Sequence, residues 1–180
     1  SYPLDPWSNL HFAEAGTDII PAMWVFNWQL THLASGDFEQ LFTGNAFYPL
    51  EESVLFSVNL LSTAFLSVPL YWVTGDFFLC YRVSIFCSFV LCSVGMLLLS
   101  RQLKLGVLAS IIASLVFAFS EYRLLSSYAN LAAMQWMPFT LLYIHKYFNE
   151  KRARHLYCAA IFFGLQTTAC ETYLILFSII

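Results

Sequence analysis

Three side chains near the start of the chain have types and spacing that could bind a divalent metal ion. His11 and Glu14 are three residues apart and Asp18 follows four residues later, so one helical face would present all three to a metal. Pro3 and Pro6, which precede this stretch, and Gly16 within it argue against a continuous helix. Asp18 also directly precedes an apolar run, where aspartate often caps a helix. A metal ligand and a helix cap are therefore alternatives for Asp18.

A second group of ionisable residues lies further along, where Glu121 and Arg123 flank Tyr122. An arginine guanidinium presents a planar fork of donors that fits phosphate, so Arg123 is a candidate for binding a substrate phosphate. Its alternative is an interfacial cation that pairs with Glu121 or with a lipid phosphate. Glu171 lies in an apolar run, where a polar contact between helices is the expected role.

The elements that must position these residues are strongly apolar. Hydrophobic residues make up 59% of the 180 positions, charged residues only 11%, and the mean hydropathy is +0.68, whereas soluble domains are about one quarter charged. The five cysteines lie in apolar runs without a Cys-x-x-Cys pair, which favours buried hydrophobes over disulfides or metal ligands. The net charge of −3 argues against nucleic-acid binding. Four stretches lack charge altogether and approach or exceed the roughly 17–25 residues of a bilayer-crossing helix: 83–100, 105–120, 124–145 and 156–170.

The charged residues divide the chain into regions that should lie on opposite sides of a membrane. Residues 1–52 carry seven of the eleven acidic residues and no Lys or Arg, which is typical of a non-cytoplasmic segment. Most of the basic residues form two clusters, Arg101 with Lys104, and Lys146 with Lys151, Arg152 and Arg154. Each cluster joins two apolar runs, so both clusters are predicted to face the cytoplasm.

The assignment of these regions to opposite sides of a membrane predicts an all-α polytopic transmembrane bundle with outer juxtamembrane helices. Within residues 76–180 we expect four crossings, at about 78–100, 105–120, 134–149 and 156–175, with 121–133 as a short outer connection. The chain begins without Met and ends in an apolar run, so we expect it to be an internal fragment, with the bundle incomplete at both ends.

Two further apolar segments are predicted to lie on the outer membrane surface. If residues 53–75 crossed the membrane, either the acidic N-terminal region would lie in the cytoplasm or the basic clusters would lie outside. This segment is therefore expected to be interfacial or half-inserted. A thin polar stripe fits that interpretation, and Pro69 should end or kink the helix. The segment Ile19 to Leu33 is predicted as a helix that ends near Ser35 and Gly36. Its Trp24 and Trp28 fit either a headgroup-level belt or core packing.

Three stretches together resemble a known family of membrane proteins. They are GTDIIPAMWVFNWQL (16–30), LFTGNAFYP (41–49) and FAFSEYRLLSSYANLAAMQWMPFTLLY (117–143). In order and spacing they resemble the first part of bacterial polytopic proteins of the GT-C glycosyltransferase superfamily, near its YfhO-like and dolichyl-phosphate-mannosyltransferase-like branches. The resemblance implies a transmembrane helix before Ser1 and an outer loop with membrane-parallel helices.

The resemblance also assigns roles to residues of this chain. An acidic residue early in the outer loop acts as catalytic base or orients the acceptor, and Asp18 matches it. Arg123 matches the group that holds the donor phosphate, with Tyr122, Gln135 and Asn45 as further substrate-binding candidates. Some members use a metal, so a divalent cation is the one cofactor considered. Glu121 stands where related sequences more often carry proline, and no catalytic role is assigned to it.

The function implied is transfer of a sugar from a polyprenyl-phosphate donor to an acceptor on the outer side of a bacterial cytoplasmic membrane. The chemistry is consistent, because such transfer needs a carboxylate for the acceptor hydroxyl and positive charge for the leaving phosphate. The alternatives are a non-enzymatic flippase or transporter for cell-envelope precursors and a structural subunit. Polar groups lining a continuous path through the bundle would favour transport.

Overall fold

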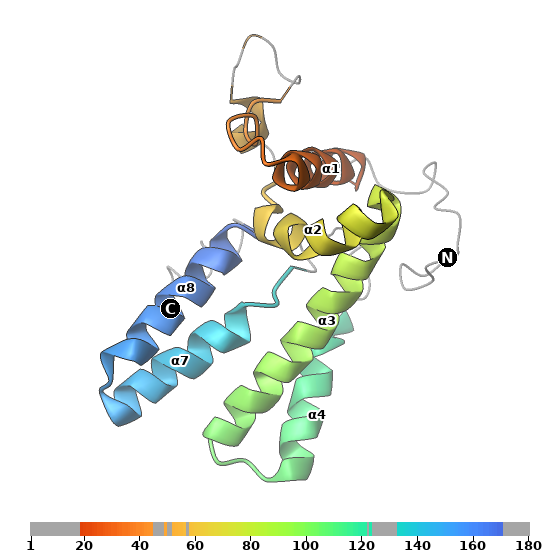
Figure 1. Ribbon diagram of the computed structural model, residues 1–180. Coiled ribbons are helices and arrows are strands. Elements are labelled where there is room, and N and C mark those ends of the chain that lie inside the picture. Colours follow the sequence, from red (N-terminus) through yellow and green to blue (C-terminus); the bar gives the residue numbers. More distant parts are fainter. Residues whose placement is uncertain are drawn as a thin grey trace.

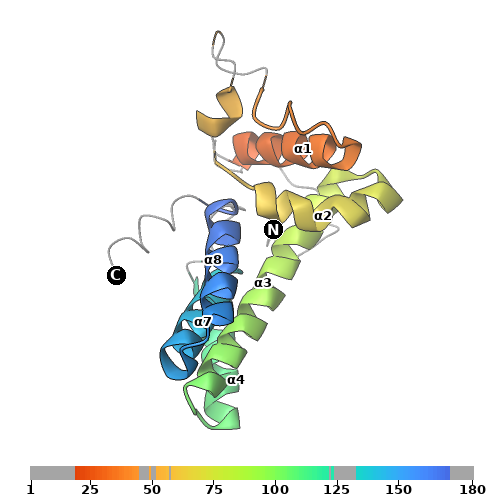
Figure 2. The same ribbon diagram turned by 60° about the vertical axis from the view of Figure 1, so that its left-hand side comes forward.

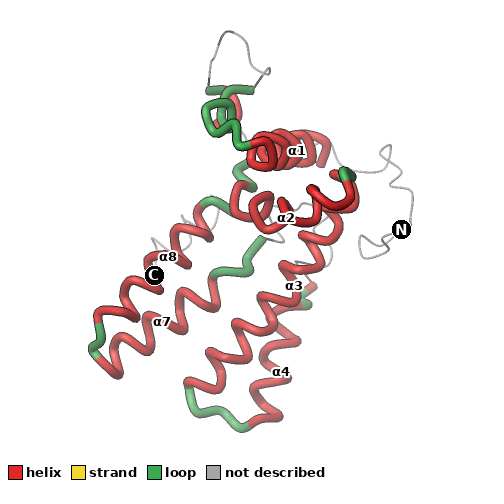
Figure 3. Tube along the Cα trace, in the orientation of Figure 1, coloured by secondary structure: helices red, strands yellow, loops and turns green. Residues whose placement is uncertain are grey.

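Every regular element that the structure describes is helical. The computed structural model describes residues 19–44, 49, 52–56, 58–121, 123 and 133–170. Its elements are α1 (Ile19–Ser35), the short 3-10 helix η1 (Ser53–Phe56), α2 (Leu61–Thr74), α3 (Phe77–Gln102), α4 (Val107–Ala118), α7 (Met137–Glu150) and α8 (Ala153–Thr167). Figure 3 shows this composition along the chain. The prediction of an all-α fold is confirmed for the described residues.

The helices form two hairpins beneath a layer of two transverse helices. The chain turns from α3 into α4 and from α7 into α8, and both turns point away from α1 and α2 (Figure 1). Figure 2 shows from a second direction that α1 and α2 lie across the other end of the hairpins. The structure therefore has one end made of transverse helices and an opposite end made of two turns.

A sharp change of direction separates α2 from α3 and has a local cause. Gly75 ends α2 in the left-handed conformation, with φ +66°, which a glycine adopts without steric cost. Asp76 then caps α3, because its Oδ1 accepts hydrogen bonds from the amides of Phe78 at 2.9 Å and Leu79 at 3.2 Å. The helix α2 continues through Pro69 to Thr74, so this proline does not end the helix.

The transverse helices are held together by one buried amide side chain and by apolar packing. Gln29 of α1 is fully buried, donates to Asn59 Oδ1 at 3.2 Å and accepts from the amide of Leu60 at 3.2 Å. These bonds satisfy polar groups at the start of α2. The apolar core beside them contains Ala22, Met23, Phe26 and Leu30 of α1, Leu60, Ala64 and Val68, and Cys80 and Tyr81 of α3.

The hairpin helices have an apolar exterior, and many of their buried positions hold small or polar side chains. Buried positions include Ser84, Ser88 and Ser100 on α3, Ser110, Ser114 and Ala118 on α4, Thr140 on α7 and Gln166 on α8. Exposed large apolar side chains include Phe86, Val90 and Val94 on α3, Leu108, Ile112 and Val116 on α4, Ile144 and Phe148 on α7, and Leu156 and Ile161 on α8. A water-soluble bundle places these classes the other way round.

The small interior residues allow close packing of helices. Gly95 of α3 lies against the start of α7, where an added Cβ would stand 2.9 Å from Phe139 Cε2 and 3.0 Å from Pro138 Cβ. Small residues at interfaces of this kind are typical of helices packed within a membrane.

One described helix has the length and composition needed to cross a membrane. This helix is α3, with 26 residues and a mean hydropathy of 2.3 over its most apolar window, whereas α2 and α4 are apolar but shorter. At about 1.5 Å per residue, α3 exceeds the roughly 30 Å hydrocarbon thickness. All four predicted crossings, including that of α3, stay a prediction.

Candidate functional site

The structure describes two of the five predicted site residues and places them in one network. Arg123 and Gln135 belong to it, whereas Asp18, Asn45 and Tyr122 lie outside the described residues. His11, Glu14 and Glu171 also lie outside them. The network therefore brings together two of the residues proposed to bind the substrate.

Arg123 is buried in the interior, with 1% of its surface exposed. Its Nη1 donates to the Ala118 carbonyl at 2.7 Å, Nη2 donates to Ser88 Oγ at 3.2 Å, and the guanidinium carbon lies 4.3 Å from the centre of the Phe89 ring. The carbonyl, the hydroxyl and the ring face in these three contacts are neutral groups that suit a cation.

Ser88 connects Arg123 to Gln135. The Ser88 hydroxyl accepts from Arg123 and donates to Gln135 Oε1 at 2.9 Å, while Gln135 Nε2 donates to Thr63 Oγ1 at 3.3 Å. One hydroxyl can serve as acceptor and donor at once. Arg123, Ser88, Gln135 and Thr63 thus form a continuous polar chain that runs through α3 to the transverse helix α2.

A second branch ties α2 to the α7–α8 hairpin. Trp136 Nε1 donates to Ser62 Oγ at 3.2 Å, and the Trp136 amide donates to Gln166 Oε1 at 3.1 Å. Gln166 Nε2 in turn donates to the Ala133 carbonyl at 2.7 Å. Because all these groups are buried, each would be costly to leave without a partner. The two branches fix the start of α2 against both hairpins.

The polar stripe of α2 faces a different environment from the one its sequence indicated. Ser62, Thr63 and Ser67 are all buried, and two of them contact Gln135 and Trp136. The stripe therefore faces the protein interior instead of the membrane surface. Its partners are 72 and 74 residues further along the chain, which is why helical spacing alone did not reveal them.

Burial decides what Arg123 can do in this arrangement. Its guanidinium donates to internal acceptors and is almost fully covered, so a substrate phosphate would reach it only after a rearrangement of its surroundings. Binding of phosphate by Arg123 stays a prediction. Sequence reasoning missed Ser88, because a serine inside an apolar helix has no local signal that separates a hydrogen-bond relay from small-residue packing.

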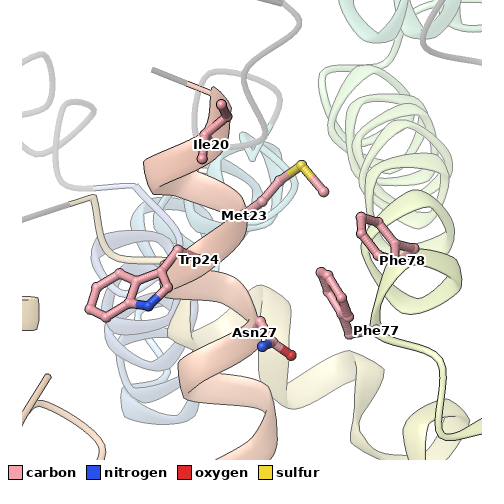
Figure 4. A pocket seen from close by; sticks show the side chains of 6 residues that line it. All are labelled: Ile20, Met23, Trp24, Asn27, Phe77 and Phe78. Atoms are coloured by element: carbon pink, nitrogen blue, oxygen red, sulfur yellow. The ribbon is translucent and has the colours of Figure 1, made fainter. Parts of the chain in front are cut away.

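An apolar cavity of about 340 Å³ lies between α1 and the start of α3. It is lined by Ile20, Met23, Trp24 and Asn27 of α1 and by Phe77 and Phe78 of α3 (Figure 4). Asn27 supplies the only polar side chain of this lining. The cavity is located on the transverse layer, and α1 begins at the residue directly after Asp18. Sequence reasoning missed the cavity, because its two walls are about fifty residues apart.

A metal site is considered only for residues that the structure describes. Among them, no group of three or more His, Cys, Asp or Glu side chains is placed to hold a metal ion. The candidate ligands His11, Glu14 and Asp18 are outside that part of the chain, so their metal binding stays a prediction.

Comparisons with protein-family models, with curated proteins and with solved structures found no match to this chain.

Proposed function

We propose that this chain is part of a polytopic membrane protein in which the hairpin helices cross the bilayer and α1 and α2 lie at its outer surface. The inverted burial pattern carries this proposal, since large apolar side chains cover the outside of the hairpins and serines line their contacts. Lipid is the solvent in which that pattern is stable. In water, the exposed apolar surface would be an aggregation liability.

The activity that we propose is transfer of a sugar from a polyprenyl-phosphate donor to an acceptor at the outer face of a bacterial cytoplasmic membrane. The resemblance to GT-C glycosyltransferases supports it. The apolar cavity between α1 and the start of α3 supports it as well, because an apolar cavity at the transverse layer could take part of a lipid-linked donor. We make no assignment of the sugar or the acceptor.

In this reaction the acceptor oxygen attacks the anomeric carbon of the donor sugar, and the bond from that carbon to the phosphate oxygen breaks. Asp18 is proposed to take the proton of the acceptor hydroxyl. The phosphate leaves with both bonding electrons, and the positive charge of Arg123 would stabilise it. Gln135 would act through Ser88 by orienting the guanidinium.

Transport through the bundle has less support than transfer at its surface. Two interior serines of α4 bond to nearby carbonyls of their own segment, Ser110 Oγ to Gly106 at 2.9 Å and Ser114 Oγ to Ile111 at 2.8 Å. A hydroxyl bonded in this way supports packing. A transport path would instead need polar groups directed at a shared channel.

Asp18→Asn tests the proposed activity directly. Asn keeps most of the shape and capping ability of Asp but accepts no proton, so in the full-length protein the turnover should fall by roughly 10²–10⁴-fold. Asp37→Asn is the matched control, because Asp37 follows the same helix, is exposed and pairs with His32 at 3.5 Å. Glycosyl transfer is measured with a short polyprenyl-phosphate sugar. Turnover in Asp18→Asn above about a tenth of wild type would exclude a general base at this position.

A further inference from the structure

The turn between α7 and α8 concentrates positive charge at the end of the molecule opposite α1 and α2 (Figure 1). Lys151 and Arg152 form the connection, Arg154 follows in the first turn of α8, and Lys146 lies one turn earlier on α7. We refer to this region as the α7–α8 turn. The Arg152 and Arg154 side chains are 61% and 65% exposed. The one acidic residue beside them is Glu150, so the turn keeps a clear excess of positive charge.

Glu150 lies closer to His155 than to the two arginines, and this difference leaves the arginines available. His155 Nε2 lies 3.0 Å from Glu150 Oε2, whereas Arg152 Nη1 and Arg154 Nη2 lie 3.6 Å and 3.8 Å from that oxygen. Charge-assisted hydrogen bonds are about 2.7–2.9 Å long, so both arginine contacts are loose ion pairs. The bond from buried His155, and then the arginine charges, lower the pKa of the Glu150 carboxyl. The histidine therefore holds this carboxylate, while the guanidinium forks remain accessible.

Lys151 occupies a backbone position that disfavours a lysine. It ends α7 with φ +54°, in the left-handed region where glycine is the usual residue. Its ammonium lies 5.0 Å from the centre of the Phe148 ring, and Phe148 is 63% exposed. An exposed aromatic ring beside a cation is typical of the membrane–water boundary. Tyr157, which is also exposed, lies one turn beyond Arg154 on α8.

We propose that the α7–α8 turn is a binding site for the phosphodiester headgroup of an anionic phospholipid, held by Arg152 and Arg154 with Lys151 beside them. A phosphodiester has two non-bridging oxygens that share one negative charge, and this pair of oxygens matches a guanidinium fork. The aromatic side chains would lie at the headgroup level, where both lipid tails and water are within reach. The proposal rests on the membrane-crossing arrangement proposed above, and it is independent of glycosyl transfer.

The α3–α4 turn provides an internal comparison. It also carries a left-handed lysine, Lys104 with φ +64°, and an arginine nearby. Arg101 differs from the arginines of the α7–α8 turn, because its Nη1 donates to the Leu105 carbonyl at 2.9 Å and so closes its own turn. The two turns therefore carry similar charge at the same end of the molecule, and only the α7–α8 turn presents two exposed guanidinium groups.

The test measures lipid selectivity in the full chain. Protein is reconstituted in phosphatidylcholine vesicles with a minor fraction of phosphatidylglycerol, and native mass spectrometry gives the ratio of the two lipids that remain bound. Arg152→Gln with Arg154→Gln should lower the bound fraction of phosphatidylglycerol by about 25-fold, since each basic residue at an anionic surface contributes about fivefold. Arg101→Gln with Lys104→Gln removes the same charge and should lower it by clearly less, because Arg101 is hydrogen-bonded to the Leu105 carbonyl of its own turn.

A second variant keeps the test valid if the double variant folds poorly. Glu150→Gln removes the carboxylate that competes for the arginines, so it should increase phosphatidylglycerol binding, a gain that misfolding cannot produce. If the two double variants lost equal amounts of bound phosphatidylglycerol, the effect would come from a diffuse surface potential, and the proposed site would be overturned. An unchanged or lower ratio in Glu150→Gln would also overturn it. Failure of the wild-type chain to float with vesicles would reject the membrane arrangement itself, whereas loss of glycosyl transfer alone would leave the lipid site standing.

Discussion

Gln135 lies between the buried cation and the transverse layer, so its amide has two partners to satisfy. It accepts from Ser88 and donates to Thr63. Gln135→Met keeps a similar shape but removes both bonds, and the two hydroxyls lose their partners inside the protein. We expect a loss of about 0.5–2 kcal/mol in unfolding free energy, within the range for hydrogen bonds between membrane helices and for buried polar groups.

Stability of this variant is measured by denaturant unfolding in detergent micelles. Gln102→Met is the matched control, because Gln102 is only half-buried and ends α3. A loss in Gln135→Met no larger than in Gln102→Met would show that the polar chain does not stabilise the fold. A stability loss with an unchanged donor KM would assign Gln135 to packing and remove it from the substrate-binding residues.

Single residues were predictable from the sequence where a local rule governed them, and otherwise they were not. The type of Arg123 made it a candidate, but phosphate binding by Arg123 and the role of Asp18 as a base stay predictions. The link from Arg123 through Ser88 to Gln135 was not predicted, because it joins residues 35 and 47 positions apart. The polar stripe of α2 was visible in the sequence, but the direction it faces depends on packing against Trp136.

The helices were more predictable than the contacts between them. The expected helix Ile19 to Leu33 corresponds to α1, which ends two residues later at Ser35 before Gly36. The apolar runs expected at 78–100 and 105–120 correspond to α3 and α4, with starts that differ by one or two residues. Apolar length and turn residues are local signals. Close approach between helices depends on pairs such as Gly95 and Phe139, which no local pattern reveals.

Gly95 and Gly164 allow that close approach to be tested with two similar substitutions. Both glycines lie inside helices, but an added Cβ would meet Phe139 and Pro138 at Gly95 and open space at Gly164. Gly95→Ala should therefore separate α3 from α7 and cost about 1–3 kcal/mol, as overpacking does. Gly164→Ala should be neutral or stabilise by up to about 1 kcal/mol through helix propensity. Thermal unfolding in detergent measures both, and equal behaviour would mean that the α3–α7 contact is not tight.

At the scale of the whole molecule, the two ends differ in charge as well as in shape. The turns at one end carry Arg101, Lys104, Lys151, Arg152 and Arg154. The opposite end carries α1, α2 and the acidic loop around Asp37 (Figures 1 and 2). A membrane between these ends would place all of the basic turns on one side. The predicted topology requires this separation of charge between the two ends. The orientation of the chain can therefore be tested at two positions, one at each end.

Lys104 and Asp37 are the positions to compare, because both are exposed in loops at opposite ends of the structure. In a variant whose native cysteines are replaced, Asp37→Cys should react with a membrane-impermeant maleimide in intact cells. Lys104→Cys should react only after the membrane is opened, because the basic turn faces the cytoplasm. Labelling of Lys104→Cys in intact cells, with protection of Asp37→Cys, would show that the orientation is the opposite of the predicted one. The lipid-binding turn would then face outward, and Asp18, nineteen residues before Asp37 in the chain, would lie on the side where no outer-face acceptor could reach it.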